Sequence, residues 1–188
     1  PSIELGEMGV HCDAIMQGNH VDVMEMDAAS RTGINDIREI IESVRYMPAS
    51  ARYKVYIIDE VHMLSKAAFN GLLKTLEEPP EHVKFIFATT EIRQVPVTVL
   101  SRCQRFDLRR LGADDTQKLL HKVCAAENES VPDEALALIA RAADGSARDA
   151  LSLLDRALAH VDPAQGDGAA LTADTMRGLL GLADRGRV

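Results

Sequence analysis

The first half of the chain alternates between short apolar runs and segments with apolar residues at helical spacing. Residues 21–26 alternate like a half-buried strand, and residues 54–58 and 83–88 are continuous apolar runs of strand length. A last strand is predicted over residues 105–109. Strands alternating with helices predict a parallel sheet with helices on both faces. The two helical stripes comprise Ile37, Ile40, Ile41 and Val44, and then Ala68, Phe69, Leu72, Leu73 and Leu76.

Residues that cap or break helices bound both of these stripes. Thr32 and Asn35 are candidate caps of the first helix, which Pro48 is expected to stop. Ser65 is the candidate cap of the second helix, and the proline pair at 79–80 ends it. These signals predict two helices of ordinary length between the strands.

After Leu111 the pattern becomes helical throughout, which predicts a small bundle of three helices. Residues 162–170 are rich in Pro, Gly, Ala and Asp and are interpreted as a linker, after which a further helix starts at 171. Residues 1–19 show little periodicity and suit a loop or a short helix. The three stripes are Leu119, Leu120 and Val123; Leu136, Ile139 and Ala140; and Ala150, Leu151, Leu154 and Leu158.

Composition narrows the class of protein. The 188 residues are 46% hydrophobic and 27% charged, as in an ordinary globular protein, with no apolar run of the ~20 residues that a membrane-spanning helix needs. The net charge of −8 argues against DNA binding over the whole surface, so any such contact must be local. Cys12, Cys103 and Cys124 are scattered, which favours reduced cytosolic thiols over a disulfide framework.

The run at 54–58 ends in two adjacent carboxylates, Asp59 and Glu60. In nucleotide-hydrolysing α/β folds the ligand lies at the carboxyl ends of parallel strands. An Asp there can hold Mg²⁺, and the neighbouring Glu can orient or deprotonate the attacking water. The alternative interpretation is a pair of solvated carboxylates in a strand-to-helix turn.

Three further features join this pair: Thr90 after the run at 83–88, Arg102 within Ser-Arg-Cys, and Arg148 at a helix start. Together they resemble the Walker B, sensor 1, arginine finger and sensor 2 elements of AAA+ ATPases. Three sequence segments are similar to the gamma/tau family of bacterial DNA polymerase III clamp-loader subunits. They are Ile-Asp-Glu-Val-His-Met-Leu-Ser, Leu-Leu-Lys-Thr-Leu-Glu-Glu-Pro-Pro and Ser-Arg-Cys. This resemblance runs over about residues 20–184.

The resemblance implies a role for each residue. Asp59 would hold Mg²⁺, directly or through water, and Glu60 would orient the attacking water. Thr90 would contact the γ-phosphate or that water; we select it because Thr89 alternates to the opposite face, and the alternative is a hydroxyl that caps the turn. Arg102 has no partner implied within the chain and would act in trans on a neighbour's nucleotide. The alternative for Arg102 is a salt bridge with Asp107 or Glu91.

Arg148 departs from an ordinary helix start. Ser146 is a candidate N-cap with Asp149 at the third position, which places Arg148 in the first turn, where the helix dipole disfavours a cation. A cation there is explained if it binds an anion such as the γ-phosphate of ATP. The alternative is a surface Arg paired with Asp144 or Asp149.

The family also implies contacts with duplex phosphates along the inside of a ring. Such contacts carry affinity but not sequence specificity. For each residue taken alone, a solvated helix face explains the charge equally well. The candidates are Arg31, Thr32, Arg38, Ser65, Lys66 and Lys74.

Two family features are missing from this sequence. None of its 12 glycines belongs to a G-x-x-x-x-G-K-[ST] loop, so we expect the chain to be part of a longer protein and inactive by itself. The order of strands in the family's sheet also implies that the first three strands are neighbours. The strand at 105–109 would be separated from them by a gap. A four-cysteine zinc hairpin is not expected, because Gly6 and Gly9 stand where two ligands would be, and Cys12 with His11 cannot close a tetrahedral site.

The sequence therefore predicts an α/β protein with part of an AAA+ parallel sheet flanked by helices, followed by a three-helix lid. The expected domains are a hairpin remnant (1–19), the nucleotide-binding part (20–110), the lid (111–161) and a linker leading to a collar (162–188). The expected function is ATP-driven loading of the sliding clamp onto primer-template DNA, with other clamp-loader subunits, in the bacterial cytoplasm. Two alternatives remain: a non-hydrolysing delta-prime-like scaffold that donates an arginine finger, and an ATPase acting on DNA junctions.

Overall fold

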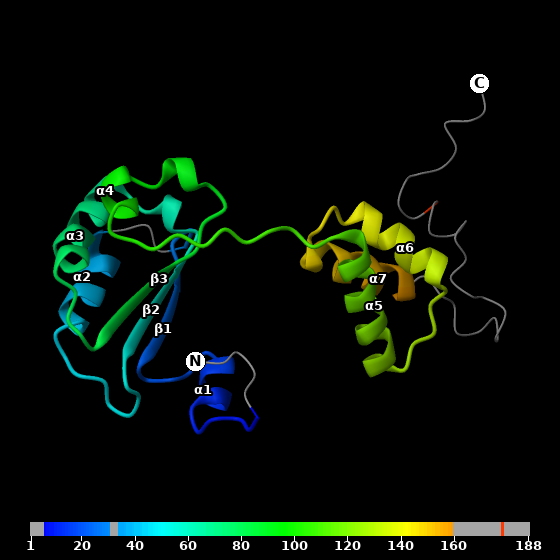
Figure 1. The fold of residues 1–188 in the computed structure, drawn as a ribbon, viewed down its shortest axis with the longest axis horizontal. Coiled ribbons are helices and arrows are strands. Elements are labelled where there is room, and N and C mark those ends of the chain that lie inside the picture. Colours follow the sequence, from blue (N-terminus) through cyan, green and yellow to red (C-terminus); the bar gives the residue numbers. More distant parts are fainter. Residues whose placement is uncertain (1–5, 31–33, 160–177, 179–188) are drawn as a thin grey trace. The chain divides into compact units, whose positions relative to one another are not determined.

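The computed structural model describes residues 6–30, 34–159 and 178 (Figure 1). The chain forms two compact units, which divide between Phe106 and Asp107. The predicted linker at 162–170 and the cap candidate Thr32 lie outside the described residues, as does the helix from 171 apart from residue 178.

Three parallel strands form the sheet of the first unit in the order β1-β2-β3. They are β1 (Val23–Asp27), β2 (Lys54–Asp59) and β3 (Val83–Phe87). Met26, Ile58 and Phe87 lie side by side in the pairing register. The first three predicted strands and their contiguous order are confirmed, with ends shifted by one or two residues.

Helices α2 (Ile34–Ser43) and α3 (Lys66–Glu77) pack against one face of this sheet (Figure 1). The chain moves from β1 to β2 to β3 in one direction across the sheet. Because β-α-β crossovers are right-handed, both connecting helices then lie on the same face of the sheet. On the other face Ile86 is 50% exposed. Coverage of both faces is therefore wrong for the described residues. The core comprises Met26, Ile37, Ile40, Tyr56, Ile58, Ala68, Phe69 and Leu72, among others.

Local caps agree with the sequence at α3 but not at α2. The Ser65 Oγ accepts the Ala68 N–H at 3.2 Å, which confirms Ser65 as the N-cap of α3. Asn35 lies inside α2 and so is not its cap, and α2 ends before Pro48. Ahead of the sheet, the short helix α1 (Cys12–Met16) confirms a helical turn within residues 1–19.

A buried carboxylate ties the loop between α2 and β2 to the start of β1. Asp22 is 2% exposed and accepts hydrogen bonds from the N–H groups of Ala49 (2.7 Å), Ser50 (2.8 Å) and Ala51 (2.8 Å), and from the Ser50 Oγ (3.2 Å). Burial by itself would raise the pKa of Asp22, but these hydrogen bonds hold that pKa well below its usual range. No sequence pattern pointed to this residue.

The fourth predicted strand is absent from the described chain. After β3 come two 3₁₀ or helical turns, η2 (Ile92–Gln94) and α4 (Val97–Leu100), and residues 104–112 then have no regular secondary structure. Phe106 and Leu108 are 74% and 94% exposed. A strand needs a hydrogen-bonding neighbour, and this alternating segment pairs with none of the three strands.

The second unit is the predicted bundle of three helices, α5 (Ala113–Glu127), α6 (Asp133–Ala142) and α7 (Ala147–Ala159). Gly145 precedes α7 with φ +80°, and a Cβ there would come within 2.8 Å of the Leu111 carbonyl oxygen. Only glycine therefore fits this turn. The core comprises Leu120, Leu136, Ile139, Ala140, Ala150 and Leu154, among others.

Within the described ranges, no helix has the length and apolar character to cross a membrane.

Candidate active site

The carboxyl end of β2 presents the two carboxylates that the sequence singled out. Asp59, the last residue of the strand, is exposed, and its Oδ1 accepts the N–H of Glu60 at 2.9 Å. Its Oδ2 accepts no hydrogen bond from the described residues. In the parallel register Asp59 pairs with Asp27, the last residue of β1, so two strand ends place carboxylates side by side. Asp27 directly follows the predicted strand at 21–26, as Glu60 follows Asp59, but no motif pointed to it.

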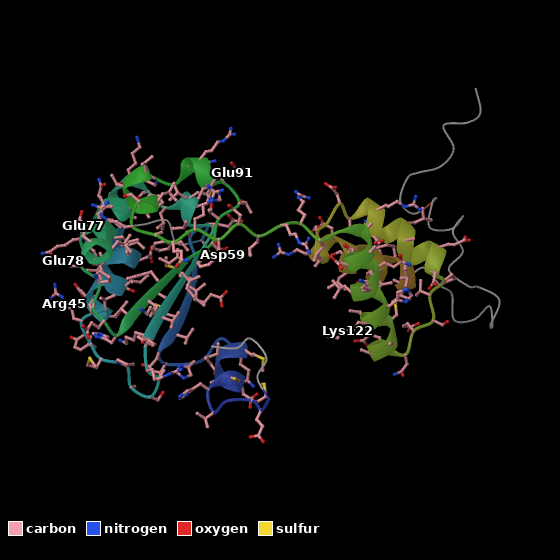
Figure 2. All side chains as sticks on the ribbon, in the orientation of Figure 1. Arg45, Asp59, Glu77, Glu78, Glu91 and Lys122 are labelled. Atoms are coloured by element: carbon pink, nitrogen blue, oxygen red, sulfur yellow. The ribbon has the colours of Figure 1, made fainter. Side chains whose placement is uncertain are left out.

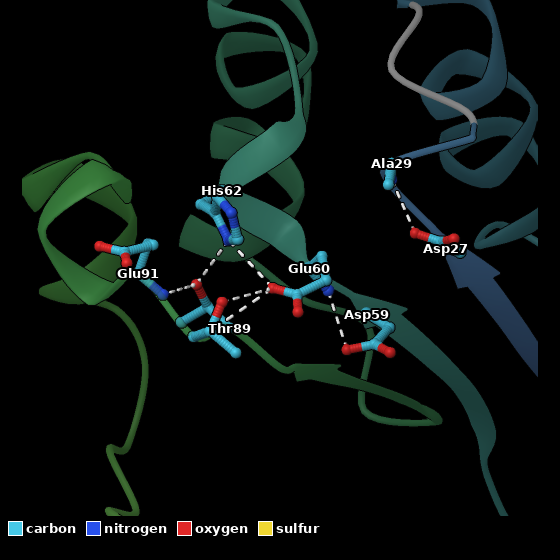
Figure 3. A network of polar contacts seen from close by, with 8 residues as sticks. Asp27, Ala29, Asp59, Glu60, His62, Thr89 and Glu91 are labelled. Atoms are coloured by element: carbon cyan, nitrogen blue, oxygen red, sulfur yellow. Dashed lines mark hydrogen bonds and ion pairs between the residues drawn. The ribbon is translucent and has the colours of Figure 1, made fainter. Parts of the chain in front are cut away.

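Glu60 leaves the strand in an unusual backbone conformation. Its φ of 46° and ψ of 45° lie in the left-handed region, which is uncommon for residues other than glycine. This turn aims the side chain along the sheet edge toward the end of β3 (Figure 3). Its Oε2 accepts hydrogen bonds from the Thr90 Oγ1 at 3.0 Å and the Thr90 N–H at 3.3 Å. Strain of this kind is concentrated at functional sites and switch regions.

The two threonines after β3 both join this network. Thr90, the residue selected from the sequence, contacts Glu60 directly. Thr89 was expected to face away, but its Oγ1 lies 2.9 Å from the Nδ1 of His62 and accepts the Glu91 N–H at 3.0 Å. Strand alternation does not extend to Thr89, because β3 ends at Phe87.

The residues of this edge fit part of a magnesium–nucleotide site. Mg²⁺ keeps several waters and takes one or two carboxylates besides the substrate phosphates, which suits an exposed Asp59 with a free oxygen. Among the described residues there is no group of three or more His, Cys, Asp or Glu side chains that could hold a metal. The phosphate-cradling loop is also absent from this sequence. The edge could therefore act on phosphates that other residues hold.

Arg102 has a partner within the chain, contrary to the expectation. Its Nη2 lies 2.5 Å from the Glu77 Oε1, and its Nη1 donates to the Thr98 carbonyl at 2.6 Å. Glu77, in the last turn of α3, lies well away from Asp59 (Figure 2). Arg102 is thus directed away from Asp59, and its side chain is 32% exposed. Within the first unit its ion-pair partner is Glu77 and not the proposed Glu91.

Arg148 lies on the exposed side of the first turn of α7. The Ser146 Oγ accepts the Asp149 N–H at 3.2 Å, so Ser146 caps the helix as the sequence predicted. Among the described residues Arg148 forms no ion pair. Asp144, one of its two proposed partners, pairs instead with Arg110 at 3.2 Å.

The residues proposed to contact DNA are only partly described. Arg31 and Thr32 lie outside the described residues. Arg38 is exposed on α2 and donates to the Asn35 side chain at 3.2 Å. Ser65 and Lys66 lie at the start of α3, and Lys74 lies two turns further along that helix. The described lysines of this set are exposed and form no ion pair with described residues.

The cysteines and their histidine neighbours form no ligand set in the described chain. His20 accepts the Asp22 N–H at its Nδ1, so its Nε2 carries the proton and donates to the His11 Nδ1 at 2.9 Å. Burial raises the pKa of the Cys103 thiol. Cys103 packs, half-buried, against the core of the first unit, and its raised pKa disfavours the thiolate that a nucleophile needs.

Comparison with protein families gives two matches. A family described as DNA polymerase III, delta subunit, matches residues 6–112. A family described as DNA polymerase III clamp loader subunit, ATPase lid domain, matches residues 116–163. The boundary between the matches lies near the division between the two compact units.

Individual relatives agree with these matches. DNA polymerase III subunit tau of Escherichia coli is 50% identical over 174 residues, which are 93% of this chain and 26% of that protein. Its counterpart in Bacillus subtilis is 54% identical over 147 residues, covering 78% of this chain and 26% of the relative. The chain therefore spans about a quarter of the length of these relatives.

Among solved structures, the RuvB Holliday junction branch migration motor of Thermotoga maritima superposes with a TM-score of 0.71. The match covers 92% of this chain and 56% of the RuvB chain, at 19% sequence identity. Identity this low shows a shared fold and nothing about the reaction.

Proposed function

Because this chain belongs to the family of DNA polymerase III clamp-loader subunits, we propose that it is part of a motor subunit that loads the sliding clamp. The intact protein would use ATP to place the clamp on primed DNA during chromosomal replication. The observation that carries this proposal is the sheet edge where Asp59 stands beside a Glu60 carboxylate that is hydrogen-bonded to Thr90. A subunit without hydrolysis would have no need of this arrangement.

Each residue at this edge of the sheet would have a separate role in phosphoryl transfer. Mg²⁺, when bound with ATP, would neutralise charge that develops on the phosphate oxygens. Asp59 would hold the ion, with water between them, through its free Oδ2. Glu60 would orient the attacking water and accept its proton. Thr90 would accept a hydrogen bond from that water at its hydroxyl oxygen, or would turn its hydroxyl proton from Glu60 to the γ-phosphate.

Two arginines would complete the site from other places. Arg102 would reach the nucleotide of a neighbouring subunit, after its exposed pair with Glu77 opens, at a cost of about 1 kcal/mol or less. Arg148 would bind the γ-phosphate as a sensor, and its lack of an ion-pair partner among the described residues supports this role. An Arg supplied in trans can be worth ~10³–10⁵ in rate.

The domain boundaries, the partners and the DNA contacts are also proposed from the family of the chain. Residues 20–110 would be the nucleotide-binding part, 111–161 the lid, 1–19 a hairpin remnant and 162–188 the approach to a collar. The partners would be other clamp-loader subunits, the sliding clamp and primer-template DNA, in the bacterial cytoplasm. Duplex phosphates would be contacted by Arg31, Thr32, Arg38, Ser65, Lys66 and Lys74.

The test is ATP turnover by the intact parent protein in its assembled complex, with and without clamp and primed DNA. We expect turnover that DNA and clamp stimulate. We expect none from these 188 residues alone, because the phosphate-cradling loop is missing from their sequence. Turnover by the isolated chain would refute the second expectation, and an inactive complex would refute the first.

A substitution locates the chemistry at Glu60. Glu60→Gln keeps the shape of the side chain but removes the basic carboxylate, so turnover should fall ~10²–10⁴-fold while ATP binding remains. The matched control is Glu81→Gln, an exposed carboxylate beyond the opposite end of β3, which should leave turnover unchanged.

The delta-subunit match over residues 6–112 favours a second candidate, a non-hydrolysing delta-prime-like scaffold. In that case Glu60→Gln would leave turnover of the assembled complex intact, whereas Arg102→Ala would lower it by removing the finger from a neighbour's site. A fall in the turnover of the assembled complex with Glu60→Gln would instead support the motor subunit.

A further inference from the structure

A mostly buried histidine lies next to the Glu60 carboxylate. His62 lies in the 3₁₀ turn η1 (Val61–Met63) that follows β2, and its side chain is only 9% exposed. Its Nδ1 lies 3.2 Å from the Glu60 Oε2 and 2.9 Å from the Thr89 Oγ1 (Figure 3). The imidazole therefore joins the ends of β2 and β3.

Of the two oxygens near Nδ1, the Thr89 hydroxyl can donate or accept, so the Glu60 carboxylate distinguishes the two tautomers. A carboxylate oxygen has no proton to give, so a bare Nδ1 would set its lone pair against those of Glu60 Oε2. With a proton on Nδ1, the ring donates to Glu60 and to the Thr89 oxygen. The Glu60 carboxylate therefore favours the tautomer that has its proton on Nδ1.

The hydrogen-bond donors around the Glu60 carboxylate lie at one of its two oxygens. The Thr90 N–H and the Thr90 hydroxyl both donate to Oε2, and the His62 Nδ1 lies 3.2 Å from the same oxygen. Oε1 accepts no hydrogen bond from the described residues. One carboxylate oxygen is thus fixed and the other is open to a water molecule.

We propose that His62 is a positioning residue, whose Nδ1–H holds the Glu60 Oε2 against Thr90 so that Oε1 faces the attacking water. This inference rests on the proposed function, because it deepens the role given to Glu60. His62 exchanges no proton with the substrate. Its effect comes from alignment alone, and a displacement of about 1 Å can cost ~10²-fold in rate.

Paired substitutions in the intact parent protein, within its assembled complex, test the alignment. His62→Leu removes the donor, so kcat for ATP should fall ~10²-fold while KM stays unchanged. In His62→Asn the side-chain N–H₂ is the same number of bonds from Cα as Nδ1, so most of kcat should return. The control is His121→Leu, at a half-exposed histidine on α5, which should have no effect.

The outcomes separate this inference from the proposed function. If Glu60→Gln lowers turnover but His62→Leu does not, or if Leu and Asn impair kcat equally, the positioning role is wrong and the function stands. If Glu60→Gln is without effect, the role of Glu60 fails, and the role of His62 fails with it.

A second measurement does not depend on turnover. The ¹⁵N chemical shifts of the His62 ring in the protein should show a protonated Nδ1. A neutral ring with its proton on Nε2 alone would overturn the assignment, whatever the kinetics.

Discussion

The buried carboxylate of Asp22 offers a quantitative test of how the first unit is held together. Its Oδ1 accepts the Ala49 N–H, and its Oδ2 accepts three donors from Ser50 and Ala51. Asp22→Asn keeps the volume of the side chain but replaces one acceptor oxygen with an NH₂ donor. In the better orientation the amide keeps the three donors on its oxygen and faces the Ala49 N–H with another N–H.

The expected loss follows from these contacts. One hydrogen bond to a charged acceptor, worth about 1.5–3 kcal/mol, disappears, and the remaining bonds weaken because the acceptor is no longer charged. Removal of a buried charge offsets part of this loss. We expect Asp22→Asn to lower the free energy of unfolding of this unit by about 2–4 kcal/mol at pH 7.

The pH dependence has a definite sign. The pKa of Asp22 is lowered in the folded state, so its stabilisation is fully present above the unfolded pKa and is lost as pH falls. With an unfolded pKa of about 3.9, about 1.3 kcal/mol of the difference between wild type and Asp22→Asn should be gone at pH 3. Above about pH 6 the difference should be constant.

Tyrosine fluorescence during urea unfolding measures this unit selectively. The chain has no Trp, and its three tyrosines, Tyr46, Tyr53 and Tyr56, all precede the division between the units. The control is Asp13→Asn, an exposed Asp in α1, which should change stability by about 0.5 kcal/mol or less. A difference for Asp22→Asn below about 1 kcal/mol, or one that does not shrink between pH 6 and pH 3, would refute the reasoning.

Three further predictions concern packing, capping and thiol reactivity. Leu136→Ala should destabilise the three-helix unit by about 2–5 kcal/mol, seen in thermal unfolding by circular dichroism, because Leu136 is fully buried; a smaller loss would contradict its place in the core. Ser146→Ala should cost about 1 kcal/mol by removing the cap of α7, and Ser146→Asp should restore stability; equal losses would argue against capping. Cys103 and Cys124 should react with iodoacetamide at pH 8 more slowly than an unstructured cysteine, because burial raises the pKa of both thiols; full reactivity without denaturant would refute this.

The elements that the sequence predicted well are those whose signal is local. Three strands and five of the helices follow from apolar runs and helical stripes. The caps at Ser65 and Ser146 follow from residues only three positions from the N–H groups they accept. Asp59 and Glu60 were identifiable because the change from an apolar run to two carboxylates marks the end of a strand.

The expectations that failed depended on contacts between distant positions. Residues 105–109 alternate between charged and apolar side chains like a strand, but a strand exists only with a neighbour to pair with. The sheet is covered on one face because the handedness of two successive crossovers, which no local pattern encodes, puts both helices on the same side.

The sequence by itself determined the order of elements, the buried stripes and the carboxylates at the end of β2, because each depends on spacing within one segment. Only the tertiary structure decided what meets these residues. Glu77 binds Arg102 across 25 positions, Asp22 reaches Ala51 across 29, and Thr89 and His62 meet across 27. Such pairs form only when the chain is packed, because packing alone brings their atoms within hydrogen-bonding distance.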